Sequence, residues 1–245
     1  VVSEGELQVV NHRQRVLASQ SIADTEIVVL FGTDRRDKIR IDSSVATQFE
    51  GSVEIHGGAR RDTLIVEGTA GDDTISVEAT AVYVNGGSDG GLSVFFGNNV
   101  EQVKVDAGNG DDLAAVNEQN GVLAVDLVLL GRRGNDILVG GSGNDRILGG
   151  AGNDIVVGGS GGDELSGGRG QDIIVAGSTD ANLTAVRSIW TSDLSYDERV
   201  DELRDVISSQ DDEATDILFG GRDRDWFLLD PFDVACDRRL FEAVN

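Results

Sequence analysis

Five nine-residue repeats follow one another without a break from Gly131 to Val175, and they constrain the fold more than any other feature of this sequence. They read GRRGNDILV, GGSGNDRIL, GGAGNDIVV, GGSGGDELS and GGRGQDIIV. Positions 1 and 4 are always glycine, position 6 is always aspartate, and position 8 is always leucine, isoleucine or valine. Such a period is typical of a solenoid in which each repeat packs only on its neighbours.

The repeats match the pattern GGxGxDxUx, where U is a large apolar residue, with one departure at Arg132 in the second position. On these residues the chain resembles the RTX, or hemolysin-type, calcium-binding nonapeptide repeat proteins. The resemblance implies an all-β fold, a right-handed parallel β-roll or β-solenoid, with Ca²⁺ ions between the turns of successive coils. Two repeats make one coil, so alternate turns stack about 4.8 Å apart.

Calcium takes six to eight oxygen ligands, and glycine lets backbone carbonyls approach an ion closely. The resemblance places ions between Asp136 and Asp154, between Asp154 and Asp172, and between Asp145 and Asp163. Carbonyls of positions 1 and 3 are expected to complete each shell. The expected metal ligands are therefore Gly131, Arg133, Asp136, Gly140, Ser142, Asp145, Gly149, Ala151, Asp154, Gly158, Ser160, Asp163, Gly167, Arg169 and Asp172.

Two residues depart from the preferred pattern, because Arg132 replaces a glycine and Gly162 replaces a polar residue. We expect a stiffer first turn and a looser fourth turn. Asp180 falls one residue outside the register, which makes a site there doubtful. Asp216 and Asp225 are plausible ligands but are expected to lack stacked partners.

The charge of the chain excludes one class of partner. Twenty Lys and Arg stand against 44 Asp and Glu, for a formal net charge of −24, so nucleic acid phosphates would be repelled.

The single cysteine, Cys236, permits neither an internal disulfide nor a cysteine zinc site. No apolar stretch long enough for a membrane span and no signal peptide are visible, and the start at Val1 indicates a fragment or a processed chain.

Weaker copies of the repeat precede the array, each with aspartate at position 6: Asp37, Asp62, Asp73 and Asp112. Alternating apolar segments lie between them and predict strands at 52–55, 81–84, 100–105 and 122–130. Residues 1–130 are thus expected to form an irregular β-solenoid continuous with a calcium-binding β-roll over 131–179. For the weaker copies a metal-free turn is favoured, since arginines such as Arg61 could pair with the stacked aspartates.

The apolar spacing becomes helical within 180–214, where Ser195 and Glu198 form a capping-box pattern. We predict two short amphipathic helices there, as an insertion. The repeat returns at Gly220–Leu228, so 215–245 is expected to contain the last repeat and a C-terminal cap. The segments IVAGSTDANLTAVRSIW, Tyr196–Val200 and GGRDRDWFLLD resemble the end of large planctomycete calcium-binding RTX-type proteins.

Enzyme motifs receive little support. Gly158–Gly162 matches GxSxG, but Ser160 occupies an ordinary repeat position and both histidines lie far away in the sequence. Trp190 and Trp226 could be sugar platforms, although core packing is the favoured role. No basic groove suited to an acidic polysaccharide is visible.

The predicted function is that of a non-enzymatic, calcium-binding structural module of a secreted or cell-surface protein, folding on calcium binding outside the cytosol. An adhesion or surface-matrix module and, less favoured, a β-helix polysaccharide-active enzyme remain alternatives. A cell-surface or polysaccharide partner cannot be named from the residues.

Overall fold

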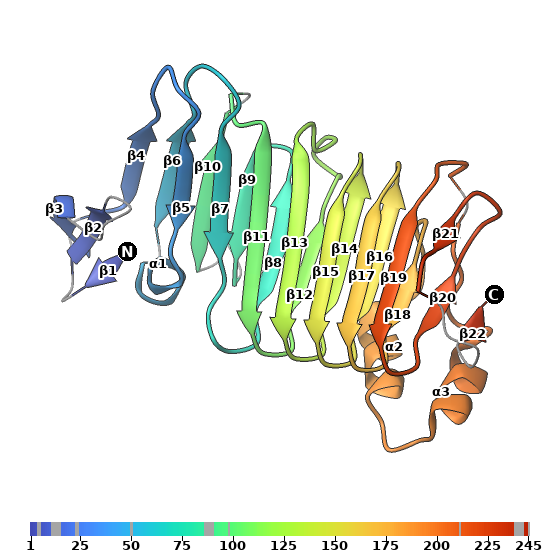
Figure 1. The fold of residues 1–245 in the computed structure, drawn as a ribbon. Helices are drawn as coiled ribbons and strands as arrows, with labels where there is room; N and C mark the ends of the chain where they lie inside the picture. Colours follow the sequence, from blue (N-terminus) through green and yellow to red (C-terminus); the bar gives the residue numbers. More distant parts are fainter. Residues whose placement is uncertain are drawn as a thin grey trace.

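A computed structural model of the chain shows an elongated parallel β-solenoid (Figure 1). It describes residues 1–3, 6–10, 16–22, 25–49, 51–85, 91–97, 99–210, 212–237 and 243–244. Strands from successive half-coils alternate between two sheets, so that the coils follow one another along the axis from the N-terminal to the C-terminal end (Figure 1). The predicted fold class is confirmed.

One sheet has eleven strands and the other eight, and we call them the eleven-strand sheet and the eight-strand sheet. The eleven-strand sheet contains β4 (Ile27–Phe31), β6 (Ser52–His56), β8 (Thr74–Glu78), β9 (Ala81–Val84), β10 (Leu92–Phe96), β12 (Leu113–Val116), β14 (Ile137–Ser142), β16 (Ile155–Ser160), β18 (Ile173–Val175), β20 (Trp226–Leu228) and β22 (Ala243–Val244). The eight-strand sheet contains β5 (Lys38–Ile41), β7 (Thr63–Glu67), β11 (Gln102–Asn109), β13 (Asp126–Arg133), β15 (Arg146–Ala151), β17 (Glu164–Arg169), β19 (Ile217–Arg222) and β21 (Val234–Ala235).

The register within the repeats is two nonapeptides per coil. Ile137 pairs with Ile155, and Ile155 pairs with Ile173, both in parallel strands. The same offset joins Ile147 to Leu165 in the eight-strand sheet. Equivalent positions of alternate repeats therefore lie side by side.

The two faces of the repeat strands are buried differently. Position 8 points into the solenoid, where Leu138 and Ile147 belong to the main core. In the eleven-strand sheet, positions 7 and 9 are apolar as well, and Ile155 and Val157 are buried on the outer face. In the eight-strand sheet, position 7 is polar and exposed in Arg146 and Glu164. The outer face of the eleven-strand sheet must therefore be covered.

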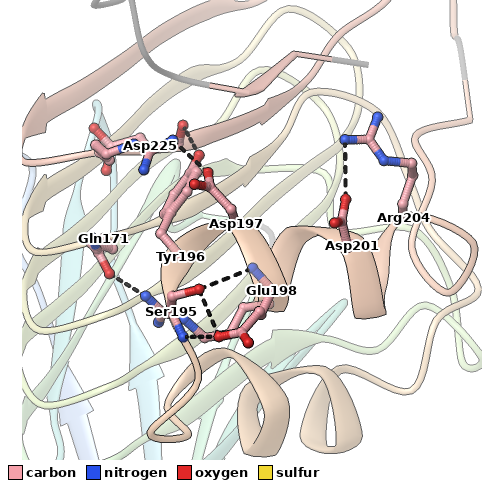
Figure 2. A network of polar contacts seen from close by, with 10 residues as sticks. Gln171, Ser195, Tyr196, Asp197, Glu198, Asp201, Arg204 and Asp225 are labelled. Atoms are coloured by element: carbon pink, nitrogen blue, oxygen red, sulfur yellow. Dashed lines mark hydrogen bonds and ion pairs between the residues drawn. The ribbon is translucent and has the colours of Figure 1, made fainter.

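Helices α2 (Leu183–Trp190) and α3 (Tyr196–Leu203) provide this cover, and they lie together near the C-terminal end of the solenoid (Figure 1). Both helices lie within the range 180–214 in which two short helices were predicted. Ser195 and Glu198 form the predicted capping box at the start of α3 (Figure 2). Apolar side chains from these helices and from the outer face of the eleven-strand sheet form one cluster, which we call the outer cluster. Trp190 and Trp226 are fully buried in it, which confirms core packing for both.

The last coil is closed by paired strands. β21 pairs with β19, and β22 pairs with β20, both in parallel. The segment after the last repeat therefore extends both sheets by one further coil. None of the helices in the described part of the chain has the length and apolar character needed to span a bilayer.

Three parts of the N-terminal half differ from a regular parallel coil. Strands β1 (Val2–Ser3), β2 (Glu6–Val10) and β3 (Val16–Ser21) form a separate antiparallel sheet. The predicted strand at 81–84 is present as β9, but it runs antiparallel between β8 and β10. A short helix, α1 (Ser43–Gln48), follows the N-cap residue Asp42 and buries Val45.

Candidate metal centre

The position-6 aspartates form two columns, one along each edge of the solenoid. In each column the backbone N–H of one aspartate donates to the Oδ1 of the aspartate in the next coil, over 2.7–3.0 Å. The first column contains Asp73, Asp112, Asp136, Asp154, Asp172 and Asp225. The second column contains Asp145, Asp163 and Asp216.

The columns extend past the helical insertion, which corrects the expectation for Asp216 and Asp225. The N–H of Asp163 donates to Asp216 Oδ1 over 2.7 Å, and the N–H of Asp172 donates to Asp225 Oδ1 over 3.0 Å. The insertion loops out, so the next repeat resumes the register as if no residues intervened. Asp180 lies outside both columns and accepts a hydrogen bond from Gln210.

The second carboxylate oxygen of each repeat aspartate has a different environment. Among the residues that the structure describes, no hydrogen-bond donor contacts the buried Oδ2 of the five aspartates of the unbroken array: Asp136, Asp145, Asp154, Asp163 and Asp172. A buried oxygen without a donor is costly unless a proton or a cation lies against it. These five oxygens fit a cation site.

Position-1 glycines leave the space that these oxygens face. A Cβ placed on Gly149 would lie 2.4 Å from Asp154 Oδ2 and 2.7 Å from the carbonyl oxygen of Gly167 in the next coil. The corresponding distances at Gly140 are 2.7 Å to Asp145 Oδ2 and 2.3 Å to a carbonyl oxygen of the next coil. Carboxylate and carbonyl oxygens thus converge beside the position-1 glycines Gly131, Gly140, Gly149 and Gly158.

Backbone conformation explains the other two glycines of the motif. Positions 2 and 4 take left-handed φ values, as at Gly150 (+123°) and Gly152 (+141°), whereas position 1 does not. Arg132 at position 2 adopts φ +85° and donates through Nε to Asp106 over 2.6 Å. The first turn therefore keeps the shape of the others despite its arginine.

The position-3 residues, whose carbonyls were expected to bind metal, lie on the outer side of the turns. Ala151 is half-buried, and Arg133, Ser160 and Arg169 are exposed. Ser142 donates to Glu118 Oε2 over 2.8 Å. Among the residues that the structure describes, no three or more His, Cys, Asp or Glu side chains form a group able to hold a metal ion. Backbone carbonyls must therefore supply much of any coordination shell.

Burial dominates the electrostatics of the columns. It raises the pKa of Asp136 and Asp145 to about 7, of Asp154 and Asp163 to about 8, and of Asp172 to about 9. Neighbouring carboxylates raise these pKa values further, as Asp136 does for Asp154. The columns are therefore poised to bind either protons or a cation at neutral pH.

The weaker N-terminal copies divide into two kinds. Asp37 and Asp73 have a threonine at position 2 of their turns, and the N–H and hydroxyl of that residue both donate to the carboxylate. Asp62 and Asp112 lack such a donor to Oδ2, which is buried in both. The metal-free interpretation agrees with the donors at Asp37 and Asp73, and for Asp62 and Asp112 it stays a prediction. Arg61 pairs with the exposed Asp126 rather than with a column aspartate, which corrects that expectation.

Position 5 forms a second set of ladders that sequence reasoning missed. The N–H of Asn153 donates to Asn135 Oδ1 over 2.8 Å, and the N–H of Gln171 donates to Asn153 Oδ1 over 2.9 Å. These bonds run toward the preceding coil, opposite in direction to the aspartate bonds. The polar residue at position 5 of the repeat is the signal that could have revealed them.

Comparison with known families agrees with this geometry. Four copies of the RTX calcium-binding nonapeptide repeat match the chain, within residues 54–79, 130–165 and 148–180. The chain therefore carries RTX calcium-binding repeats on a parallel β-solenoid, and Ca²⁺ is the cofactor of these repeats. The match at 54–79 includes the weaker copies around Asp62 and Asp73. No curated protein matches the chain.

Proposed function

We propose that this chain is a structural module of an exported protein that folds when its two aspartate columns bind calcium outside the cytosol. The supporting observation is the row of buried Oδ2 atoms without a hydrogen-bond donor in five successive repeats. A module held by the family's cofactor, rather than an enzyme, is the function that this regular arrangement supports best.

The proposed ligands are the carboxylates of Asp136, Asp145, Asp154, Asp163 and Asp172, with the carbonyls of positions 1 and 3 in the same five repeats. Asp216 and Asp225 extend the two columns by one further coil each. Bound calcium would supply positive charge between carboxylates that otherwise repel one another.

The columns also explain why folding would depend on calcium. An unfolded chain has no preformed site, so binding free energy adds to folding free energy. Extracellular calcium modules bind with dissociation constants of about 10⁻⁴–10⁻³ M, far above the calcium concentration of a cytosol. A chain with such sites would stay loose inside the cell and close after export.

Titration of the metal-depleted chain with calcium and, in parallel, with magnesium tests this function. Calorimetry gives the stoichiometry, and circular dichroism gives the gain in β-structure. Calcium should order the chain and raise its melting temperature, whereas magnesium should do so poorly because it needs a smaller octahedral shell. Identical behaviour in calcium, magnesium and chelator would refute the proposal.

A pair of charge-matched variants separates ligand loss from a change in net charge. D136N/D154N/D172N removes three charges from the first column, and D193N/D201N/D205N removes three from exposed positions. The first variant should lose the ions of the first column and keep those of the second. The second variant should bind calcium as the unmodified chain does.

A further inference from the structure

Three arginines lie in one row across the outer edge of the first column. Arg133, Ala151, Arg169 and Arg222 are successive register partners in β13, β15, β17 and β19. Register partners in parallel strands point their side chains to the same side and lie about 4.8 Å apart. Arg169 and Arg222 are therefore adjacent, and Ala151 leaves a gap of two strand spacings between Arg133 and Arg169.

This gap forms an open hollow of about 480 Å³, lined by Arg133, Ala151, Gly152, Arg169, Gly170 and Asp223. Two of the lining residues are glycines, so the backbone is accessible there. Two guanidinium groups flank the hollow, and one carboxylate lies beside them. The lining thus combines donors for an anion with an acceptor for a hydroxyl group.

The row differs from the other arginines by its register rather than by its lack of ion pairs. Arg40, Arg61, Arg132, Arg146 and Arg224 each pair with a carboxylate, whereas in the described part of the chain the exposed Arg35, Arg36 and Arg60 have no ion pair. In the described part of the chain, no ion pair joins a carboxylate to Arg133, Arg169 or Arg222, and all three are exposed. The register places three such arginines on one line along the solenoid, so they form a basic stripe on a chain of net charge −24.

Asp223 adds a local irregularity at the same place. It has φ +76° at position 4, where the preceding coils of this edge have Gly134, Gly152 and Gly170. A left-handed aspartate where glycine is the rule is a strained choice, and such choices concentrate at functional sites. Its carboxylate lines the hollow beside the guanidinium groups.

We propose that this stripe binds an acidic polysaccharide, with sugar carboxylates on Arg133 and Arg169 and sugar hydroxyls on Asp223. A linear polyanion fits because the row is straight and runs along the solenoid axis, and Arg222 continues it beyond the hollow. A nucleic acid duplex would press its broad phosphate surface against the surrounding acidic protein. The row could not be found in the sequence because its members are far apart along the chain.

The proposal rests on the proposed function, since the calcium-bound array holds these four strands in register. The experiment therefore measures both ligands on the same full chain. Calorimetry in saturating calcium measures binding of a hyaluronan oligosaccharide, with neutral dextran and single-stranded DNA as comparisons. R133Q/R169Q/R222Q is compared with R35Q/R36Q/R146Q, which removes the same charge from exposed positions away from the hollow.

The row variant should lose at least tenfold in hyaluronan affinity, and the control variant should stay within about twofold of the unmodified chain. Calcium stoichiometry should be equal in all three, because position 3 is proposed to bind calcium through its backbone carbonyl, which these side-chain substitutions keep. Dextran and DNA should bind weakly. Absence of hyaluronan binding by a chain that takes up calcium fully, equal binding by the two variants, or DNA binding as tight as hyaluronan binding would each overturn the proposal. R169Q alone, which should reduce affinity severalfold, keeps the test decisive if the triple variant fails to fold. Failure of the unmodified chain to bind calcium would instead refute the proposed function.

Discussion

The backbone N–H of Asp136 donates a hydrogen bond of 2.9 Å to Oδ1 of Asp154, eighteen residues further along the chain. The two carboxylate oxygens of Asp154 therefore have different roles. Oδ1 accepts the hydrogen bond from the preceding coil, and Oδ2 is buried without a donor among the described residues. Loss of the charge and loss of the acceptor can be separated at this one residue.

Asp154→Asn keeps an acceptor for the Asp136 N–H but removes the charge. We expect the calcium stoichiometry to fall by two, since Asp154 lies between Asp136 and Asp172, while stability in chelator rises above that of the unmodified chain. Asp154→Ala also removes the acceptor and should cost a further 1–3 kcal/mol or so, because the buried N–H loses its partner. Calorimetry and chelator melting curves measure both effects. An unchanged stoichiometry in either variant would remove Asp154 from the ligands.

Stability without calcium should decrease as the pH rises. The folded-state pKa values of the five array aspartates are raised from 3.8 to about 7–9, so the folded chain binds more protons than the unfolded chain between these limits. Their contribution to stability is fully present below pH 3.8 and is lost as the pH rises through the folded pKa values.

Melting temperatures of the metal-depleted chain at pH 5, 7 and 9 check this dependence. Added calcium should remove most of the decrease, and its affinity should rise with pH because protons compete for the same oxygens. A melting temperature that rises from pH 5 to pH 9 without calcium would contradict the assignment of these groups.

Position-1 glycine should tolerate no side chain. Gly149→Ala would place a Cβ 2.4 Å from Asp154 Oδ2 and 2.7 Å from the Gly167 carbonyl, which forces the turn apart. We expect a loss of roughly 1–3 kcal/mol, as for other overpacked sites, together with weaker calcium binding. Gly71→Ala is the matched control, because nothing lies within 4 Å of its Cβ and its φ is not left-handed. Chemical unfolding in calcium should show little change for Gly71→Ala, and equal effects of the two substitutions would argue against the steric account.

The outer cluster should matter to stability independently of the second column. Trp190 is fully buried, and its Nε1 donates to the Gln171 carbonyl over 2.6 Å. The Arg199 guanidinium donates to the side-chain oxygen of Gln171, and this bond links the insertion to the repeat array in the same region. Trp190→Ala should cost about 3–5 kcal/mol, measured by urea unfolding in saturating calcium.

Leu194→Ala serves as the control for Trp190, since Leu194 is 41% exposed in the link between α2 and α3. It should change stability by less than about 0.5 kcal/mol. Binding between Asp145 and Asp163 should persist in both variants. Loss of that site in Trp190→Ala would show that the helices hold both edges rather than one.

The coil repeat and the capping of α3 could be predicted from the sequence because each depends on local spacing. Ile137 pairs with Ile155 since the nonapeptide period leaves one register, and Ser195 and Glu198 form their capping box within a single turn of helix. The stacking of Asp216 and Asp225 could not be predicted by counting residues, because the insertion between them and the array adds nothing to the register.

Other features depend on contacts that the period does not encode. The triple apolar segments of alternate repeats, such as Ile155–Val157, do indicate a strand buried on both faces, and this signal for helical cover was available in the sequence. The antiparallel course of β9 and the helix α1 carry no such periodic signal, and they depend on pairing and packing with distant residues.

The two ladders of hydrogen bonds point in opposite directions along the axis, so the order in which the two ladders form depends on which end of the chain folds first. The N–H of Asn153 finds its acceptor in the coil already formed, whereas the N–H of Asp136 waits for the coil that follows. In a chain that emerges amino-terminus first, the newest coil therefore has its position-5 hydrogen bond to the preceding coil, while its aspartate N–H still lacks an acceptor. A chain emerging carboxyl-terminus first meets its aspartate acceptors at once, so the direction of emergence decides which ladder closes first.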